Sequence, residues 1–171
     1  MKISIIIPAY NEEKRIKRTL EHYHEYLSAL STTNNFDYEL VVVLNGCRDN
    51  TLAVVSAVQA VWGKTVIINL AESGKGLAII AGFKDALTRP NDFIGFVDAD
   101  MATAPEYFYD LVRSIDGDGI IASRYIKGSV VTPQRPFVKI WGRKIFYNSL
   151  IRLLFGLRFH DYQCGAKLFK H

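Results

Sequence analysis

The sequence predicts an α/β fold in which a doubly wound, mostly parallel sheet is flanked by helices. Segments with strand-like apolar runs alternate with segments of helical periodicity at least four times along the 171 residues. The strand-like runs are apolar on both faces, which is typical of parallel strands covered by helices on both sides. No internal repeat or low-complexity linker interrupts this alternation, so right-handed crossovers within one domain are expected.

The first half of the chain contains three expected strands, at residues 2–7, 40–44 and 65–70. The first is expected to end at Pro8, because proline lacks the amide proton of a sheet ladder. Residues 11–13, Asn-Glu-Glu, are expected to open a helix with acidic side chains in its first turn, where the helix dipole favours them. Residues 31–35 are polar and predict a loop, and a turn ending at Thr51 is expected to start the second helix.

The second half continues the alternation with a helix after residues 74–76, a strand at 93–97, a helix at about 105–115 and a short strand at 119–123. The carboxyl ends of parallel strands meet at one rim of a sheet. This rim would gather residues 8–12, 45–49, 74–76 and 98–100. Ligands of open α/β sheets bind at that rim, so we expect a nucleotide-sized cleft there.

Two carboxylates follow the fourth strand. Asp98 and Asp100 are separated only by Ala99 in the segment Phe-Val-Asp-Ala-Asp. Paired carboxylates at the end of a strand suit Mg²⁺ or Mn²⁺, which proteins hold with one or two acids together with substrate phosphate oxygens. The alternative is an acidic turn that caps the helix starting near Pro105, and the spacing alone does not choose between the two.

Composition sets further limits. With 49% hydrophobic residues, the chain can bury a substantial core. The net charge of +4 allows an anionic substrate or membrane surface and does not call for nucleic acid as a partner. No apolar stretch reaches the roughly 20 residues of a spanning helix. The two cysteines, Cys47 and Cys164, do not form a disulfide framework, so a cytoplasmic location is expected.

The segment at about residues 135–158 is basic and aromatic. It contains six basic side chains and no acidic one. A helix of this composition can lie at an anionic membrane face, which would make the protein peripheral on the cytoplasmic side. The charges do not segregate to one helical face, so a core helix with basic residues turned to water or to a phosphate is favoured over membrane contact.

Two common nucleotide-binding motifs are absent. The segment around Gly74-Lys75-Gly76 lacks the first glycine and the serine or threonine of a P-loop. Pro-Ala-Tyr-Asn-Glu follows the first strand in place of a glycine-rich dinucleotide fingerprint, which argues against hydride chemistry on a nicotinamide.

Four other motifs occur in the order of one enzyme family. They are Ile-Ile-Ile-Pro-Ala-Tyr-Asn-Glu-Glu at 5–13, Gly-Lys-Gly at 74–76, Val-Asp-Ala-Asp at 97–100 and Asp-Tyr-Gln-Cys-Gly-Ala-Lys-Leu-Phe at 161–169. In these motifs the chain resembles the inverting family 2 glycosyltransferases of GT-A fold, a Rossmann-like architecture. Within that family it is most similar to the dolichyl- and polyprenyl-phosphate glucosyltransferase and mannosyltransferase branch. The resemblance implies a single catalytic domain over residues 1–171, with a nucleotide-binding part at about 1–123 and an acceptor-side part at about 124–171.

The resemblance also implies roles for individual residues. In the nucleotide-binding part, the nucleoside would be held by Pro8, Tyr10 and Glu12, with Asn45 at the base and Lys75 nearby. Asp98 and Asp100 would position the sugar diphosphate, Asp100 most directly through the metal. The catalytic group would comprise Asp98, Asp100, Arg124, Gln163 and Lys167, with Mg²⁺ or Mn²⁺ bound by the two aspartates. Asn45 stands in Leu-Asn-Gly-Cys, where the family usually has an Asp-Asp-Gly-Ser type of turn, which leaves the bound base open.

The implied reaction moves a hexose from a nucleotide-diphosphate sugar to a polyprenyl or dolichyl phosphate, with inversion and with a metal. UDP-glucose is the favoured donor, because Asp-Ala-Asp-Met-Ala-Thr at 98–103 is similar to the glucosyl branch. Two anionic groups must meet, so a cationic clamp is expected from Arg124 and from Arg135 or Arg143.

Two other functions fit the same motifs. A transferase acting on a saccharide or protein hydroxyl would need a carboxylate base, for which the candidates are Asp116 and Asp118. The third hypothesis is a nucleotide-sugar-binding module without turnover.

Overall fold

The computed structural model describes residues 1–33, 35–124, 153–154, 156 and 161–171. The chain divides into two compact units. The sheet unit comprises Met1–Ile120 and Gly165–His171, and the second unit comprises Ile121–Cys164. The assignment of the whole chain to one catalytic domain, with parts divided near residue 124, stays a prediction.

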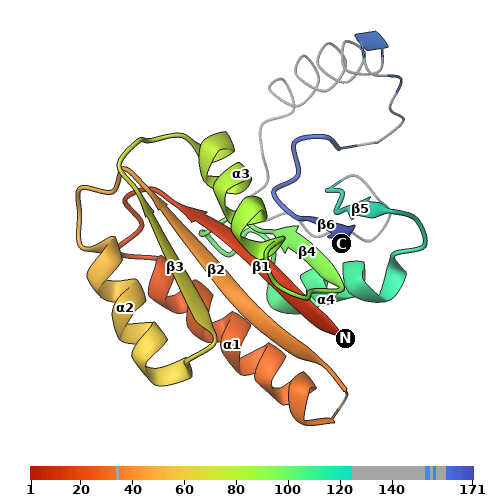
Figure 1. The fold of residues 1–171 in the computed structure, drawn as a ribbon, viewed down its shortest axis with the longest axis horizontal. Helices are drawn as coiled ribbons and strands as arrows, with labels where there is room; N and C mark the ends of the chain where they lie inside the picture. Colours follow the sequence, from red (N-terminus) through yellow and green to blue (C-terminus); the bar gives the residue numbers. More distant parts are fainter. Residues whose placement is uncertain (34, 125–152, 155, 157–160) are drawn as a thin grey trace. The chain divides into compact units, whose positions relative to one another are not determined.

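A six-stranded sheet forms the centre of the sheet unit (Figure 1). Its strands are β1 (Lys2–Ala9), β2 (Asp37–Asn45), β3 (Thr65–Leu70), β4 (Phe93–Phe96), β5 (Gly119–Ile121) and β6 (Lys167–Lys170). Their order across the sheet is β3-β2-β1-β4-β6-β5. The ladders joining β1 to β2, β1 to β4 and β2 to β3 are parallel, whereas β6 runs antiparallel to β4. The predicted mostly parallel sheet is therefore confirmed.

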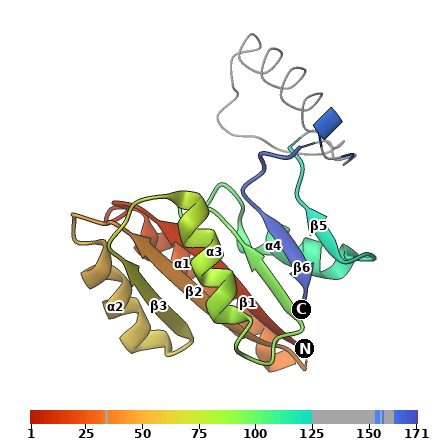
Figure 2. The same ribbon diagram turned by 45° about the horizontal axis from the view of Figure 1, so that its top comes forward.

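Helices cover both faces of this sheet. Helices α1 (Ile16–Thr33), α2 (Thr51–Trp62) and α4 (Pro105–Ser114) lie on one face, and α3 (Lys75–Ala86) lies on the other (Figure 2). Every crossover between the first four strands passes through a helix, as parallel pairing requires. Within the part of the chain that the structure describes, no helix combines the length and apolarity needed to span a bilayer.

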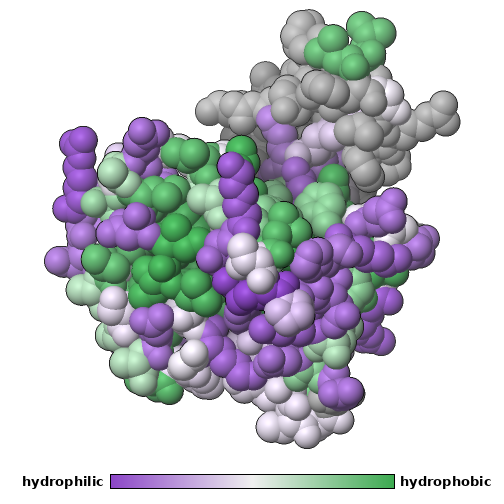
Figure 3. Space-filling view, viewed as in Figure 1, coloured by the Kyte–Doolittle hydropathy of each residue, from purple (hydrophilic) through white to green (hydrophobic). Residues whose placement is uncertain are grey.

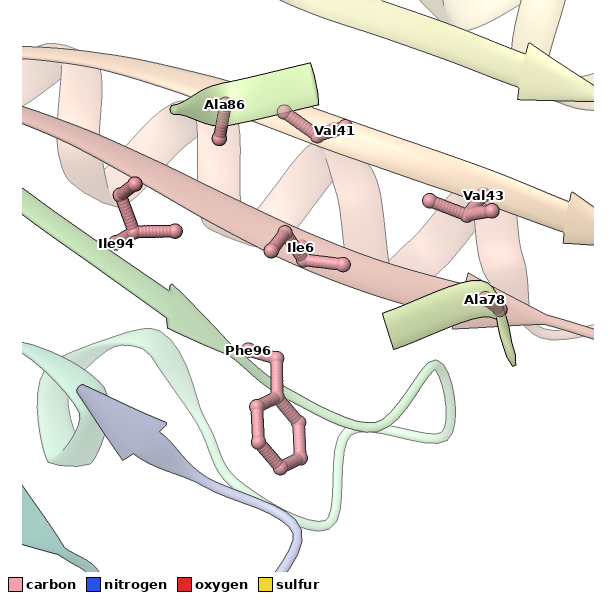
Figure 4. Close-up of a cluster of buried hydrophobic side chains, with 7 residues drawn as sticks. All are labelled: Ile6, Val41, Val43, Ala78, Ala86, Ile94 and Phe96. Carbon is pink, nitrogen blue, oxygen red and sulfur yellow. The ribbon is translucent and has the colours of Figure 1, made fainter. Parts of the chain in front are cut away.

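The face under α3 is packed with small and branched side chains. Ile6, Val41 and Val43 of the central strands meet the helix there, beside Ala78 and Ala86 (Figure 4). Helix α3 approaches closely because its buried positions are Ala78, Gly82 and Ala86, whereas Leu77 and Ile80 are exposed. It leaves apolar side chains of β3 only partly covered, and Figure 3 shows this hydrophobic surface beside α3.

Pro8 does not end the first strand, contrary to expectation. Strand β1 continues to Ala9, with Pro8 opposite Val43 of β2. The carbonyl of Ile6 accepts a hydrogen bond from the amide of Val97, so Ile6 points its polar groups toward β4. Pro8 lies two residues further along and faces the same way, but β4 has already ended at Phe96. The missing amide proton therefore removes no ladder hydrogen bond.

The first helix also differs from expectation at both ends. It begins at Ile16 and has no acidic residue in its first turn. Asn11 has a φ of 52°, and the amides of Arg15 and Ile16 both donate to the carbonyl of Glu12, so residues 11–15 form a turn ahead of the helix. At the other end the helix extends to Thr33, because the hydroxyls of its last residues donate to carbonyls of the final turn. The predicted loop at 31–35 is therefore wrong in its first three residues.

Strand β3 spans the expected residues 65–70, whereas β2 begins at Asp37, three residues before its predicted start. Strand β6 is an addition that the sequence did not reveal. Most of the basic segment at 135–158 lies outside the described residues, so the alternatives of core helix and membrane contact stay open.

Candidate functional site

The sheet order creates a switch point between β1 and β4. From β1 the chain moves outward through β2 and β3, and then returns to place β4 on the other side of β1. In open α/β sheets a crevice for a ligand lies at such a switch point, outside the carboxyl ends of the strands. A pocket of about 510 Å³ occupies this position. It is lined by Pro8, Tyr10, Glu12, Asn45, Ser73, Gly74, Lys75, Asp98, Ala99 and Asp100.

All six predicted donor-side residues line this pocket, as does the second aspartate, Asp100. They come from four separate segments: the ends of β1, β2 and β4, and the first turn of α3. The structure thus brings together positions that are up to 92 residues apart in the sequence, from Pro8 to Asp100. Their individual roles stay predictions.

Two of the lining residues, Asp98 and Lys75, form an ion pair. The ammonium of Lys75, at the first position of α3, lies 2.5 Å from Oδ1 of Asp98. The Asp98 side chain is 29% exposed and that of Lys75 57% exposed, so the pair is accessible to solvent and to a ligand. The pocket therefore contains a cation that can neutralise Asp98 or turn to an incoming anion.

The acidic residues do not cap the following helix. The residue preceding α4 is Ala104, and no side chain caps this end. Asp100 is exposed, and its Oδ1 accepts a hydrogen bond of 3.0 Å from the amide of Ala102, which stabilises a tight turn. Within that turn, Met101 has a φ of 60°. The helix-capping interpretation of the two aspartates is therefore wrong.

Helix α1 is hydrogen-bonded to the loop that carries Asp98 and Asp100. The hydroxyl of Thr19 donates to the carbonyl of Ala99 at 2.7 Å, and the hydroxyl of Tyr23 donates to the carbonyl of Thr103 at 2.8 Å. Both donors are buried, and the hydrogen bond from Thr19 is itself buried, whereas that from Tyr23 is part-buried. The loop that presents Asp98 and Asp100 is thereby fixed to the body of the sheet unit.

Asn45 connects two other walls of the pocket. Its side chain is almost fully buried, with 3% of the residue exposed. The amide Nδ2 donates to the carbonyl of Ala9 at 2.8 Å, and Oδ1 accepts from the amide of Gly74 at 3.2 Å. Both ends of the amide thus bind backbone, which ties the end of β1 to the loop before α3. An aspartate could not make both bonds, because it cannot donate when ionised.

The loop after β1 is joined to the loop after β2. The amide of Glu12 donates to the hydroxyl of Thr51 at 2.8 Å, and the amide of Arg48 donates to Oδ1 of Asn11. The carboxylate of Glu12 binds Arg15 through two hydrogen bonds, which raise the pKa of the arginine. Tyr10 is 50% exposed at the pocket wall, so its ring is available to a flat ligand.

The donor set at the pocket suits a hard divalent cation. Two carboxylates, from Asp98 and Asp100, line it. Among the described residues no cluster of three or more histidine, cysteine or acidic side chains exists that could enclose a metal. Mg²⁺ and Mn²⁺ fit such an open set, because they are commonly held by one or two carboxylates and complete their shell with water and phosphate oxygens.

The predicted catalytic residues of the C-terminal motif divide between the units. Lys167 begins β6, opposite Phe96, and its ammonium lies 5.5 Å from the centroid of the Phe96 ring. It therefore belongs to the strand pair that carries Asp98. Gln163 is exposed in the second unit. Arg135 and Arg143, the other candidates for a phosphate clamp, lie outside the described residues.

Arg124 is held by an acid that the sequence analysis did not single out. Within the second unit its Nε and Nη2 donate to the two carboxylate oxygens of Asp161 at 2.7 and 2.8 Å. Burial opposes ionisation of Asp161, but hydrogen bonds from Arg124 outweigh it and keep the pKa of the carboxyl below its ordinary value. Asp161 opens the motif at 161–169, but nothing in the sequence identified Arg124 as its partner.

Comparisons with known proteins agree with the resemblance seen in the motifs. Residues 4–171 match the family model described as Glycosyl transferase family 2. The chain is 34% identical to a dolichyl-phosphate beta-glucosyltransferase of Trichomonas vaginalis, over 98% of the chain and 53% of that protein. It is 33% identical to a dolichyl-phosphate beta-glucosyltransferase of Drosophila melanogaster, over 99% of the chain and 54% of that protein. The chain thus spans about half the length of these curated relatives.

Solved structures show the same architecture. A mannosyltransferase from Pyrobaculum calidifontis, in complex with GDP-Man and Mn²⁺, has a TM-score of 0.62 and 19% identity, over 98% of this chain and 44% of that one. Mannosyl-3-phosphoglycerate synthase from Rubrobacter xylanophilus has a TM-score of 0.65 and 16% identity, over 99% and 54% of the two chains. These likenesses confirm the predicted GT-A fold.

Proposed function

Because the chain belongs to glycosyl transferase family 2, we propose that it transfers a hexose from a nucleotide-diphosphate sugar to a polyprenyl phosphate such as dolichyl phosphate. UDP-glucose is the favoured donor, and the reaction proceeds with inversion and requires Mg²⁺ or Mn²⁺. The observation that carries this proposal is the pocket at the switch point, where Asp98, Asp100 and Lys75 meet Tyr10 and Glu12. The relatives named above as dolichyl-phosphate beta-glucosyltransferases support the choice of sugar and acceptor.

On the donor side, the exposed ring of Tyr10 stacks on the base, with Pro8 and Glu12 at the nucleoside. Asn45 contributes by holding the two loops that frame the base, since both ends of its amide bind backbone. Lys75 leaves Asp98 and turns its ammonium to the diphosphate, which carries more negative charge than one carboxylate. Gln163 and Lys167 act beside the sugar or the diphosphate.

Asp98 and Asp100 would hold the metal, with Asp100 the more accessible of the two. When bound, the cation supplies electrostatic stabilisation of the charge that develops on the departing nucleoside diphosphate. The two aspartates need little rearrangement during the reaction, because hydrogen bonds from Thr19 and Tyr23 already fix the loop that carries them.

An acceptor phosphate needs no strong general base, because it is already anionic near neutral pH. One of its oxygens forms the bond to the anomeric carbon while the bond from that carbon to the diphosphate breaks, which inverts the configuration. A saccharide hydroxyl would need a carboxylate base near the pocket. Asp116 and Asp118 are exposed before β5 and are not among the residues lining the pocket, which favours the phosphate acceptor.

Arg124 forms an ion pair with Asp161 and therefore contributes to stability, in addition to its proposed role in binding the acceptor phosphate. Removing its guanidinium leaves Asp161 buried without this cation, so we expect Arg124→Ala to destabilise the fold. Asp161→Asn tests the clamp separately, because it keeps Arg124 and removes only the acid. If Arg124 binds the acceptor, Asp161→Asn should bind polyprenyl phosphate as tightly as wild type or more tightly. If the role of Arg124 is purely structural, activity should fall in step with stability in both Arg124→Ala and Asp161→Asn.

The proposed function is tested by calorimetric titration of UDP-glucose and GDP-mannose, with and without Mn²⁺, followed by transfer to a short polyprenyl phosphate. We expect UDP-glucose binding that depends on Mn²⁺ and is lost in Asp98→Asn and Asp100→Asn. Asp116→Asn serves as the matched control, because Asp116 is an exposed acid outside the pocket. Donor binding without transfer would favour the nucleotide-sugar-binding module, and loss of transfer in Asp116→Asn would favour the hydroxyl acceptor.

Contact with the cytoplasmic face of a membrane belongs to the same proposal, since the acceptor is a lipid. Residues 135–158 stay the candidate segment on the basis of their composition alone. Sedimentation with anionic vesicles that contain polyprenyl phosphate tests this contact. Absence of binding at low ionic strength would rule out the proposed membrane contact.

A further inference from the structure

The carboxylate of Asp98 packs against the backbone of Gly165. Strand β6 is antiparallel to β4, with Lys167 opposite Phe96. Continuing this register by two residues places Gly165 opposite Asp98. A Cβ atom on Gly165 would lie 2.0 Å from Oδ2, 2.5 Å from Cγ and 3.0 Å from Oδ1 of Asp98. The position of the carboxylate therefore depends on the absence of a side chain at Gly165.

Backbone conformation does not explain this glycine. The described glycines with positive φ are Gly46, Gly63, Gly74 and Gly156, so Gly165 lies outside the left-handed region. The three atoms nearest to its missing Cβ all belong to the carboxylate of Asp98. The Cβ of an alanine would therefore clash most closely with this carboxylate, so a glycine is needed at position 165 to leave space for Asp98.

We infer that Gly165 is a positioning residue that, together with Lys75, sets the orientation of the Asp98 carboxylate. This inference rests on the proposed function, in which Asp98 faces the metal and the diphosphate. Lys75 binds Oδ1 at 2.5 Å, and the Cβ position of Gly165 lies closest to Oδ2. Both oxygens are thus placed by groups from distant parts of the chain, α3 and the segment entering β6.

The size of the effect follows from the distances. Cβ atoms in proteins essentially never approach other heavy atoms closer than 3.0 Å, whereas Oδ2 is 2.0 Å from the Cβ position. The carboxylate of Gly165→Ala must therefore move by about 1 Å or more. A displacement of about 1 Å in a catalytic group can lower the rate about 100-fold. We expect a turnover loss of that order. We also expect Mn²⁺ to bind at least about tenfold more weakly in the presence of UDP, because groups that orient a metal ligand set metal affinity.

The test compares Gly165→Ala with Gly117→Ala. Gly117 also lacks a positive φ, and a Cβ there meets nothing within 4 Å, so this control should keep wild-type Mn²⁺ affinity and transfer. Mn²⁺ binding is measured by electron paramagnetic resonance in the presence of UDP. Wild-type protein that binds no Mn²⁺ would refute the proposed function. Wild-type binding with equal binding by Gly165→Ala would refute the role of Gly165 and leave the proposed function intact.

A second measurement does not depend on the metal. A crystal structure of Gly165→Ala should show the Asp98 carboxylate displaced and its ion pair with Lys75 broken, with the backbone of residues 165–170 unchanged. If alanine lowers the urea midpoint of unfolding, adding Asp98→Ala should restore it, because Asp98→Ala removes all three clashing atoms. An unmoved carboxylate, or a midpoint that stays equally depressed in the double variant, would overturn the inference.

Discussion

Replacing Lys75 by methionine should change metal binding and donor binding in opposite directions. In the structure the ammonium of Lys75 holds Oδ1 of Asp98, so a divalent cation must displace it. Methionine keeps most of the length of the side chain and removes the charge. We therefore expect Lys75→Met to bind Mn²⁺ more tightly than wild type when no nucleotide is present, and to bind a nucleoside diphosphate more weakly.

The magnitude follows from the exposure of the pair. The two side chains are 57% and 29% exposed, so water screens their attraction, and such pairs contribute about 0.2–1 kcal/mol. Removing the competing ammonium should therefore raise Mn²⁺ affinity by up to about fivefold, since about 1.4 kcal/mol corresponds to a factor of ten. A charge-assisted hydrogen bond to the diphosphate is worth about 1.5–3 kcal/mol, so UDP binding in saturating Mn²⁺ should weaken at least about tenfold.

Isothermal titration with Mn²⁺ alone, and with UDP in saturating Mn²⁺, measures both effects. Lys84→Met is the matched control, because Lys84 is an exposed lysine in the last turn of the same helix. It should leave both affinities unchanged. Mn²⁺ affinity that is equal or lower in Lys75→Met would refute the competition between lysine and metal, even if UDP binding weakened.

Two further predictions concern stability. Burial lowers the pKa of His24 from 6.5 to about 4, so the folded protein favours the neutral imidazole. The unfolded chain therefore binds the proton more readily below about pH 6.5. The free energy of unfolding should be steady above that pH and fall by about 3 kcal/mol as the pH drops to 4. Urea titrations at each pH should show a smaller loss in His24→Gln, and an unchanged loss in the control His22→Gln, whose histidine is exposed. If the free energy of unfolding had the same dependence on pH in both variants, the burial argument would be contradicted. Gly82→Ala should cost about 1–3 kcal/mol, because its Cβ would lie 2.5 Å from Cγ2 of Ile6. Gly76→Ala, in the same helix with nothing within 4 Å of its Cβ, should instead stabilise by about 0.5–1 kcal/mol, and a similar loss in both would remove steric overlap as the cause.

The sequence predicted the elements where periodicity and turn chemistry were unambiguous. The β-branched run at 65–70 became β3, and the alternation of strands and helices gave the mostly parallel sheet. Local rules failed where tertiary context supplied a partner. Pro8 is tolerated inside β1 because the neighbouring strand has ended, and residues 11–15 form a turn because their amides and side chains bind the adjacent loop. Single-sequence patterns carry no information about such neighbours.

The same division applies to the candidate site. By itself the sequence determined that Asp98, Asp100 and Lys75 leave the sheet at one rim, and all three line one pocket, while their chemical roles stay predictions. Only the tertiary structure decided how these groups are oriented: that Lys75 neutralises Asp98, that Asn45 joins two loops, and that Gly165 leaves room for a carboxylate. The physical reason is that residue type and spacing fix which strand end a side chain leaves from, whereas its partners come from segments brought beside it by sheet order and by the register of β6.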